Sequence, residues 1–226
     1  MTTTLRRAAL LALALLVTAC SDQAPTAPSA TPTPQPNALL SGLLGGLGGQ
    51  STLEQQKARE LSRVRAAALV NGVLYTTLKP VWETATPVTN LLGLPLLQCP
   101  PLPYDADVQI VGREGGVLRV GPHSLTIPAG ALRQATVITA EAEVGLVRTV
   151  KFSPHGLKFD RATQLDLSYV GCRTSPTDRP TITYVDGELT ILEWLNTTVL
   201  SGDVVRGDVW HFSRYAASRS SYATSW

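Results

Sequence analysis

The sequence lacks a run of basic residues and any cluster of histidines, and each absence argues against a class of function. A nucleic-acid surface needs lysine and arginine gathered on one face, so we expect no nucleic-acid partner. The histidines His123, His155 and His211 stand singly, far from the spacing of metal ligands. We therefore expect no metal site and no other cofactor.

Common catalytic motifs are also missing. The glycine-rich stretch at residues 38–49 is not followed by Gly-Lys-Ser/Thr, so it is not a phosphate-binding loop, and no serine lies in Gly-x-Ser-x-Gly. Glu141 and Glu143 alternate onto one face of an expected strand, but we interpret them as solvated carboxylates rather than a glycosidase pair. We expect no enzymatic activity, apart from the self-cleavage considered below.

The N-terminus has the features of an export signal. An apolar run at residues 8–17 follows two arginines and is too short to cross a bilayer, which is typical of a signal peptide over residues 1–19. It ends in Val17-Thr18-Ala19-Cys20, which resembles the bacterial lipoprotein box. We expect Cys20 to be acylated and to anchor the mature protein in a lipid bilayer. An ordinary secretory signal that contains a cysteine is the alternative.

This anchor predicts an extracytoplasmic location on the bacterial cell envelope. Ser21, rather than aspartate, follows the cysteine, so the outer membrane is expected where the host has one. Residues 20–50 are rich in proline and glycine and predict a flexible tether. Ser51 and Glu54 form a capping box that predicts a short helix from residue 52 to residue 70. Prolines then break residues 73–103, which predicts an extended lead-in within the segment 51–106.

Residues 107–217 alternate between apolar and polar positions in short runs separated by glycine and proline. This pattern predicts a mainly β fold, an antiparallel β-sandwich, followed by a tail at 218–226. Asp186-Gly187 predicts a two-residue hairpin turn. The expected strands span 107–112, 116–121, 124–127, 135–144, 149–152, 164–169, 181–185, 188–194 and 203–212, with a short piece near Tyr215.

Four short sequence pieces follow one another in this region. They are Gly115-Gly116-Val117-Leu118, Leu125-Thr126-Ile127-Pro128-Ala129-Gly130-Ala131-Leu132, Pro154-His155-Gly156-Leu157-Lys158-Phe159 and Leu165-Asp166-Leu167. As an ordered set they resemble the ZU-type domain of zonula occludens proteins, ankyrins and netrin receptors. The resemblance implies a β-sandwich used for protein contacts. We expect no death domain or spectrin-binding region in this sequence, so the partners of those proteins are not expected to carry over.

Two cysteines remain once Cys20 is assigned to lipidation. Cys99 and Cys172 form an even pair in an exported chain, where oxidation is the usual state. We expect a disulfide between them, which would join the proline-rich lead-in to the strand that ends at Tyr169. Two separate buried thiols are the alternative.

The sequence His211-Phe212-Ser213 is a candidate self-cleavage site. Some members of the resembled family cut themselves between Phe and Ser in this triplet. In that chemistry Ser213 attacks the preceding carbonyl, His211 acts as a base or polariser, and the peptide Ser213–Trp226 is released. The structural alternative is that Phe212 is simply a core residue of a last strand.

These features together predict a membrane-anchored lipoprotein whose β-sandwich is a non-enzymatic interaction module for a protein partner. Self-cleavage between Phe212 and Ser213 is one alternative function. A carbohydrate-binding module is another, and it requires exposed tryptophans in a row from among Trp194, Trp210 and Trp226.

Overall fold

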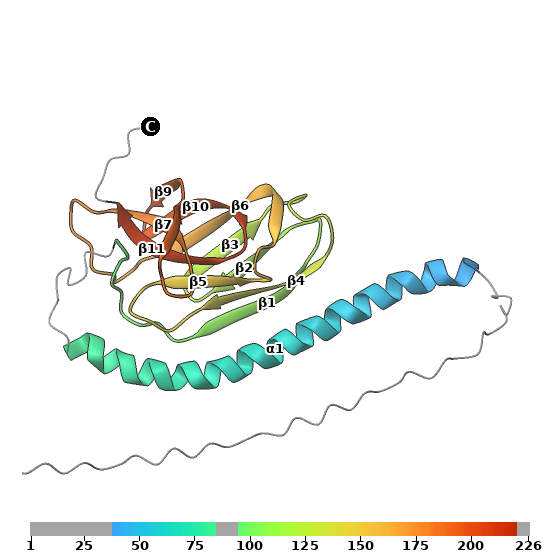
Figure 1. The fold of residues 1–226 in the computed structure, drawn as a ribbon, viewed down its shortest axis with the longest axis horizontal. Coiled ribbons are helices and arrows are strands. Elements are labelled where there is room, and N and C mark those ends of the chain that lie inside the picture. Colours follow the sequence, from blue (N-terminus) through green and yellow to red (C-terminus); the bar gives the residue numbers. More distant parts are fainter. Residues whose placement is uncertain (1–37, 85–94, 221–226) are drawn as a thin grey trace, which may run out of the picture. The chain divides into compact units, whose positions relative to one another are not determined.

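The part of the chain that the structure describes is mainly β, with one long helix (Figure 1). The structure, a computed structural model, describes residues 38–84 and 95–220, with side chains described from residue 52. Within these ranges the strands form two antiparallel sheets that pack as a β-sandwich, which confirms the predicted fold class. The expected signal peptide, Cys20 and the tether up to residue 37 lie outside the described residues.

Both sheets are built from antiparallel neighbours. In the described ranges the first sheet has six strands, in the order β1 (Asp105–Val111), β4 (Thr136–Ala142), β5 (Thr149–Ser153), β11 (Arg214–Ser220), β7 (Arg179–Val185) and β8 (Ile191–Trp194). The second has five, in the order β2 (Gly116–Val120), β3 (His123–Ile127), β6 (Lys158–Ser168), β10 (Val204–His211) and β9 (Thr197–Leu200). Strand β9 was not predicted, and β11 extends into the expected tail.

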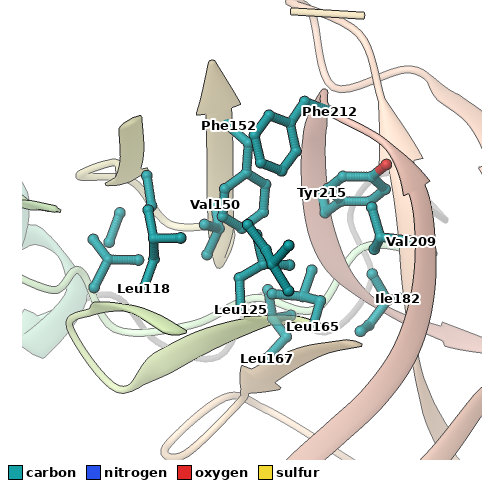
Figure 2. Close-up of a cluster of buried hydrophobic side chains, with 14 of the residues drawn as sticks. Leu118, Leu125, Val150, Phe152, Leu165, Leu167, Ile182, Val209, Phe212 and Tyr215 are labelled. Atoms are coloured by element: carbon teal, nitrogen blue, oxygen red, sulfur yellow. The ribbon is translucent and has the colours of Figure 1, made fainter. Parts of the chain in front are cut away.

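The hydrophobic core lies between the sheets and uses the inward positions of the alternating strands. Figure 2 shows side chains from both sheets converging there. The apolar residues of the alternating runs are buried, namely Leu118, Val120, Leu125, Ile127, Val150, Phe152, Leu165, Leu167 and Tyr169. Burying each such side chain stabilises the fold by about 1.5–3 kcal/mol, against the entropy cost of ordering the chain.

The turn between β7 and β8 differs from the expected two-residue hairpin. It runs over residues 186–190, because the Asp186 carboxylate accepts hydrogen bonds from the backbone N–H groups of Glu188 (2.9 Å) and Thr190 (2.8 Å). Leu189 adopts a positive φ of 65° to complete the loop. The side chain of Asp186 thus stabilises a wider turn than the Asp-Gly pair alone indicated.

Helix α1 (Ala38–Thr84) is much longer than the predicted helix. The expected flexible stretch at residues 38–50 and the expected extended stretch at 73–84 are both helical, so these predictions are wrong. Ser51 lies inside the helix and is not its N-cap. Asn71 donates its side-chain N–H to the carbonyl of Ala67 one turn earlier, rather than ending the helix. Pro80 lies near the C-terminal end, where a missing N–H costs a single backbone hydrogen bond.

From residue 95 the chain runs as the extended lead-in that the prolines predicted. It follows the first sheet: Leu97 donates its backbone N–H to Ala217 (3.0 Å) and is fully buried. The disulfide between Cys99 and Cys172 is present and confirms the predicted pair. It closes a loop between positions 73 residues apart and joins this lead-in to the chain that follows β6.

Loss of this disulfide should destabilise the sandwich. In the chain-entropy model a loop of this length contributes about 4 kcal/mol, because the crosslink restricts the unfolded chain. Urea unfolding of the Cys99→Ala/Cys172→Ala variant should therefore show a free energy of unfolding lower by about that amount. Cys20→Ser is the control and should leave it unchanged. Free thiols at both positions in the denatured, unreduced protein would contradict the assignment.

Candidate functional site

The chain crosses from the second sheet to the first between β10 and β11. Only Phe212 and Ser213 connect these strands. The Phe212 ring is fully buried, with its centroid 5.2 Å from that of Phe152 and 4.9 Å from that of Phe159. Packing of this ring in the core fixes the crossing point, so the next residue, Ser213, makes the bend into β11.

Strand β5 and the loop after it hydrogen-bond the backbone on both sides of the Phe212–Ser213 peptide bond. Phe212 donates its N–H to the carbonyl of Leu157 (2.8 Å), and its own carbonyl accepts the N–H of Gly156 (2.9 Å). The Ser213 carbonyl accepts the N–H of Phe152 (2.9 Å). Gly156 has a φ of 77°, a left-handed conformation that other residues rarely adopt. The peptide bond is therefore held in one orientation, with an amide donor on its carbonyl oxygen.

Ser213 lies beside a histidine that the motif does not contain. Its Oγ is 3.5 Å from Nε2 of His155, and both residues line a cavity of about 260 Å³. Lys151, Tyr184 and Arg214 also line this cavity. Ser213 itself is only 2% exposed, whereas His155 is exposed. The arrangement places a hydroxyl, an imidazole nitrogen and a hydrogen-bonded carbonyl together.

The imidazole of His211 lies elsewhere. It packs edge-on against Tyr184, with ring centroids 5.2 Å apart, and its Nε2 is 3.9 Å from the Glu193 carboxylate. Its backbone carbonyl accepts the Tyr215 hydroxyl. Among the described contacts, none joins the His211 ring to Ser213, so the structure does not bring together the predicted pair. It brings Ser213 to His155, which is 58 residues away in sequence and which no local motif connects to it.

Glu141 and Glu143 are engaged in ion pairs. Glu141 is 5% exposed and accepts hydrogen bonds from Arg63 of α1 (2.8 and 3.2 Å) and from the Tyr104 hydroxyl (2.7 Å). Glu143 accepts one from Arg214 at 2.9 Å. The prediction of solvated carboxylates is therefore wrong for Glu141, because a helix that the strand pattern does not reveal covers it.

The helix also contacts the sandwich near the disulfide. The Arg173 guanidinium carbon lies 4.2 Å from the centroid of the Trp82 ring, a cation–π distance, and Arg173 follows Cys172 directly. Together with the Arg63–Glu141 pair, this contact attaches α1 to the sandwich at positions 63 and 82.

Electrostatics around Glu141 favour its charged form. Burial on its own raises the pKa of this carboxyl, but the hydrogen bonds from Arg63 and Tyr104 outweigh burial and hold the pKa below its ordinary value. His123 shows the opposite balance. Burial lowers its pKa to about 3, and Nδ1 accepts the N–H of Ser168 at 3.0 Å. His123 is thus a neutral structural residue.

The other features considered are the exposed tryptophans, a metal-binding cluster and a membrane-spanning helix. Trp194 and Trp210 are exposed, but they lie on β8 of the first sheet and β10 of the second, so they do not line one sheet face. Trp226 lies outside the described residues. Among the described residues, no group of three or more His, Cys, Asp or Glu side chains is arranged to hold a metal ion. Within the same residues, no helix has the length and hydropathy needed to cross a membrane.

No protein-family model and no curated protein matches this chain. The resemblance to the ZU-type domain therefore rests on the four sequence pieces and stays an expectation.

Removing the charge of Glu141 should weaken the attachment of α1. Glu141→Gln leaves Arg63 without its charged partner on the sandwich. We expect the free energy of unfolding to fall by about 1–3 kcal/mol. This is less than for a fully buried ion pair, because Arg63 is partly exposed. Urea unfolding measures the change in free energy, and limited trypsin digestion within α1 reports whether the helix has detached from the sandwich. The matched control is Arg133→Gln, which removes the exposed Arg133–Asp160 pair and should have a much smaller effect.

The effect of Glu141 should also depend on pH. Its folded-state pKa lies below the unfolded value of about 4.3, so its contribution is fully present above that value. The contribution is lost as the pH falls through the lowered folded-state pKa. The difference between wild type and Glu141→Gln should therefore shrink in acid, and a constant difference down to low pH would contradict this assignment.

Proposed function

We propose that this protein is an extracytoplasmic lipoprotein, anchored through Cys20 to the bacterial cell envelope, whose β-sandwich binds a protein partner. The observation that carries the proposal is the pairing of Cys99 with Cys172. This pairing leaves Cys20 as the remaining cysteine of the sequence. Cys20 follows an apolar run and ends a sequence that resembles the lipoprotein box. Disulfides are typical of exported proteins, which supports the same location.

The surface of α1 supports a binding role. Leu69, Val70 and Val73 are 77%, 72% and 68% exposed. Leu69 and Val73 are four residues apart and share a face of the helix, roughly opposite the buried Val64. Contiguous exposed apolar side chains of this kind are commonly buried in protein contacts.

Anchoring through Cys20 has a direct test. The Cys20→Ala variant is produced in the native bacterium. It should be absent from the detergent phase of a Triton X-114 partition, because no acyl chain can be attached to alanine. The wild type should enter that phase, and mass spectrometry should find acyl groups on its N-terminal peptide. Equal partition of the two proteins would reject the anchor. Cys99→Ala/Cys172→Ala is the control and should still partition with detergent.

We propose self-cleavage between Phe212 and Ser213 as a second function. The observation that favours it is the Ser213 hydroxyl beside an imidazole, at a peptide bond whose carbonyl already accepts an amide hydrogen bond. In this reaction Ser213 Oγ bonds to the Phe212 carbonyl carbon, the C–N bond breaks, and an ester forms. Water then hydrolyses the ester, leaving a carboxylate on Phe212 and a free amine on Ser213.

The sheet order changes the expected product. Strand β11 pairs with β5 on one side and β7 on the other, so the peptide Ser213–Trp226 should stay bound after cleavage rather than be released. Mass spectrometry under denaturing conditions should show two fragments of the wild type, and native conditions should show them together. Ser213→Ala should stay intact, and Ser213→Cys, which keeps a nucleophile, should cleave. A single full-length mass for the wild type would reject this function.

A further inference from the structure

We propose that His155, rather than His211 of the motif, is the catalytic base for cleavage at Ser213, and that the Gly156 amide binds the developing oxyanion. This inference rests on the self-cleavage proposed above. It follows from the position of two adjacent residues in one loop. His155 Nε2 faces the attacking hydroxyl at 3.5 Å, and the Gly156 N–H lies 2.9 Å from the oxygen of the carbonyl under attack.

The motif histidine has a different role in this fold. The His211 imidazole packs against Tyr184 and lies near the Glu193 carboxylate, and its carbonyl accepts the Tyr215 hydroxyl. These contacts position the end of β10. His211 is absent from the residues that line the cavity, whereas His155 and Ser213 both line it.

The reaction balances with these groups and one water. His155 Nε2 accepts the Ser213 hydroxyl proton as Oγ bonds to the Phe212 carbonyl carbon, and the carbonyl electron pair moves onto oxygen. The Gly156 N–H stabilises this oxygen, as a single backbone donor does in an oxyanion hole. The protonated imidazole then gives its proton to the Ser213 nitrogen as the C–N bond breaks. A water molecule then hydrolyses the ester, adding OH to the acyl carbon and H to Oγ.

The backbone of the loop is suited to this donor role. A Cβ built on Gly156 meets no atom within 4 Å, so space does not require glycine at this position. The φ of 77° favours glycine, because residues with a side chain rarely adopt this left-handed conformation. The Gly156 N–H meets the Phe212 carbonyl from the residue that follows His155. One turn therefore supplies both the base and the oxyanion donor.

The test compares matched histidine variants of the full chain. Wild type, His155→Gln and His211→Gln are made by cell-free synthesis, and the fragment ending at Phe212 is followed over time by denaturing mass spectrometry. We expect His155→Gln to slow cleavage by about 10²–10⁴-fold, the usual contribution of a positioned general base. His211→Gln should cleave at nearly the wild-type rate. Because His155 is exposed, its replacement removes no core packing.

Chemical rescue separates catalysis from a structural effect. The His155→Gly variant opens space beside a cavity of about 260 Å³, so added imidazole should restore cleavage in proportion to its concentration. Imidazole should not restore cleavage of Ser213→Ala. Hydroxylamine added to the wild type should yield a hydroxamate on Phe212, because it attacks the ester and not an ordinary peptide bond.

The outcomes separate self-cleavage itself from the assignment of its base to His155. An intact wild type rejects self-cleavage and this inference together. Cleavage of His155→Gln at the wild-type rate overturns the inference and leaves self-cleavage standing. Slow His211→Gln beside fast His155→Gln assigns the base to the motif histidine. Slow His155→Gln with imidazole rescue of His155→Gly supports the assignment to His155.

Discussion

Burial of the Phe212 ring between Phe152 and Phe159 is the constraint on which the described site depends. Strands β10 and β11 belong to different sheets, and two residues join them. The ring must point into the core between the sheets, so the chain can turn only at the next residue. The crossing therefore fixes Ser213 against the loop after β5. The Phe212 ring that precedes it belongs to the same core that stabilises the sandwich and lies beside Phe152 (Figure 2).

Polar contacts on the outer side of the first sheet attach the helix and the lead-in to this core. Glu141 would be costly to bury alone, and Arg63 and Tyr104 offset that cost by hydrogen bonds to both carboxylate oxygens. The disulfide between Cys99 and Cys172 restrains the segment that leads into β1. The Arg63–Glu141 pair and the Trp82–Arg173 contact thus link the helix to the sandwich, whereas the lead-in also buries Leu97 in the hydrophobic core.

Much of the sandwich was predictable because strand alternation is a local pattern. Leu118, Leu125 and Leu165 alternate with polar neighbours, and all three are buried as expected. The limits of helix α1 were not predictable in this way. Gly72 and Pro80 are signals that end helices in isolation, and the contacts of Arg63 and Trp82 with the sandwich are made by residues far away in sequence.

By itself the sequence determined the class of fold, the inward residues of most strands and the cysteine pair, because alternation, turn residues and an even thiol count are readable along the chain. It also identified the Phe212–Ser213 bond as a candidate site of self-cleavage. The tertiary structure alone decided which histidine faces Ser213 and that Glu141 is covered. Both depend on contacts between residues 58 and 78 positions apart, which only folding brings together.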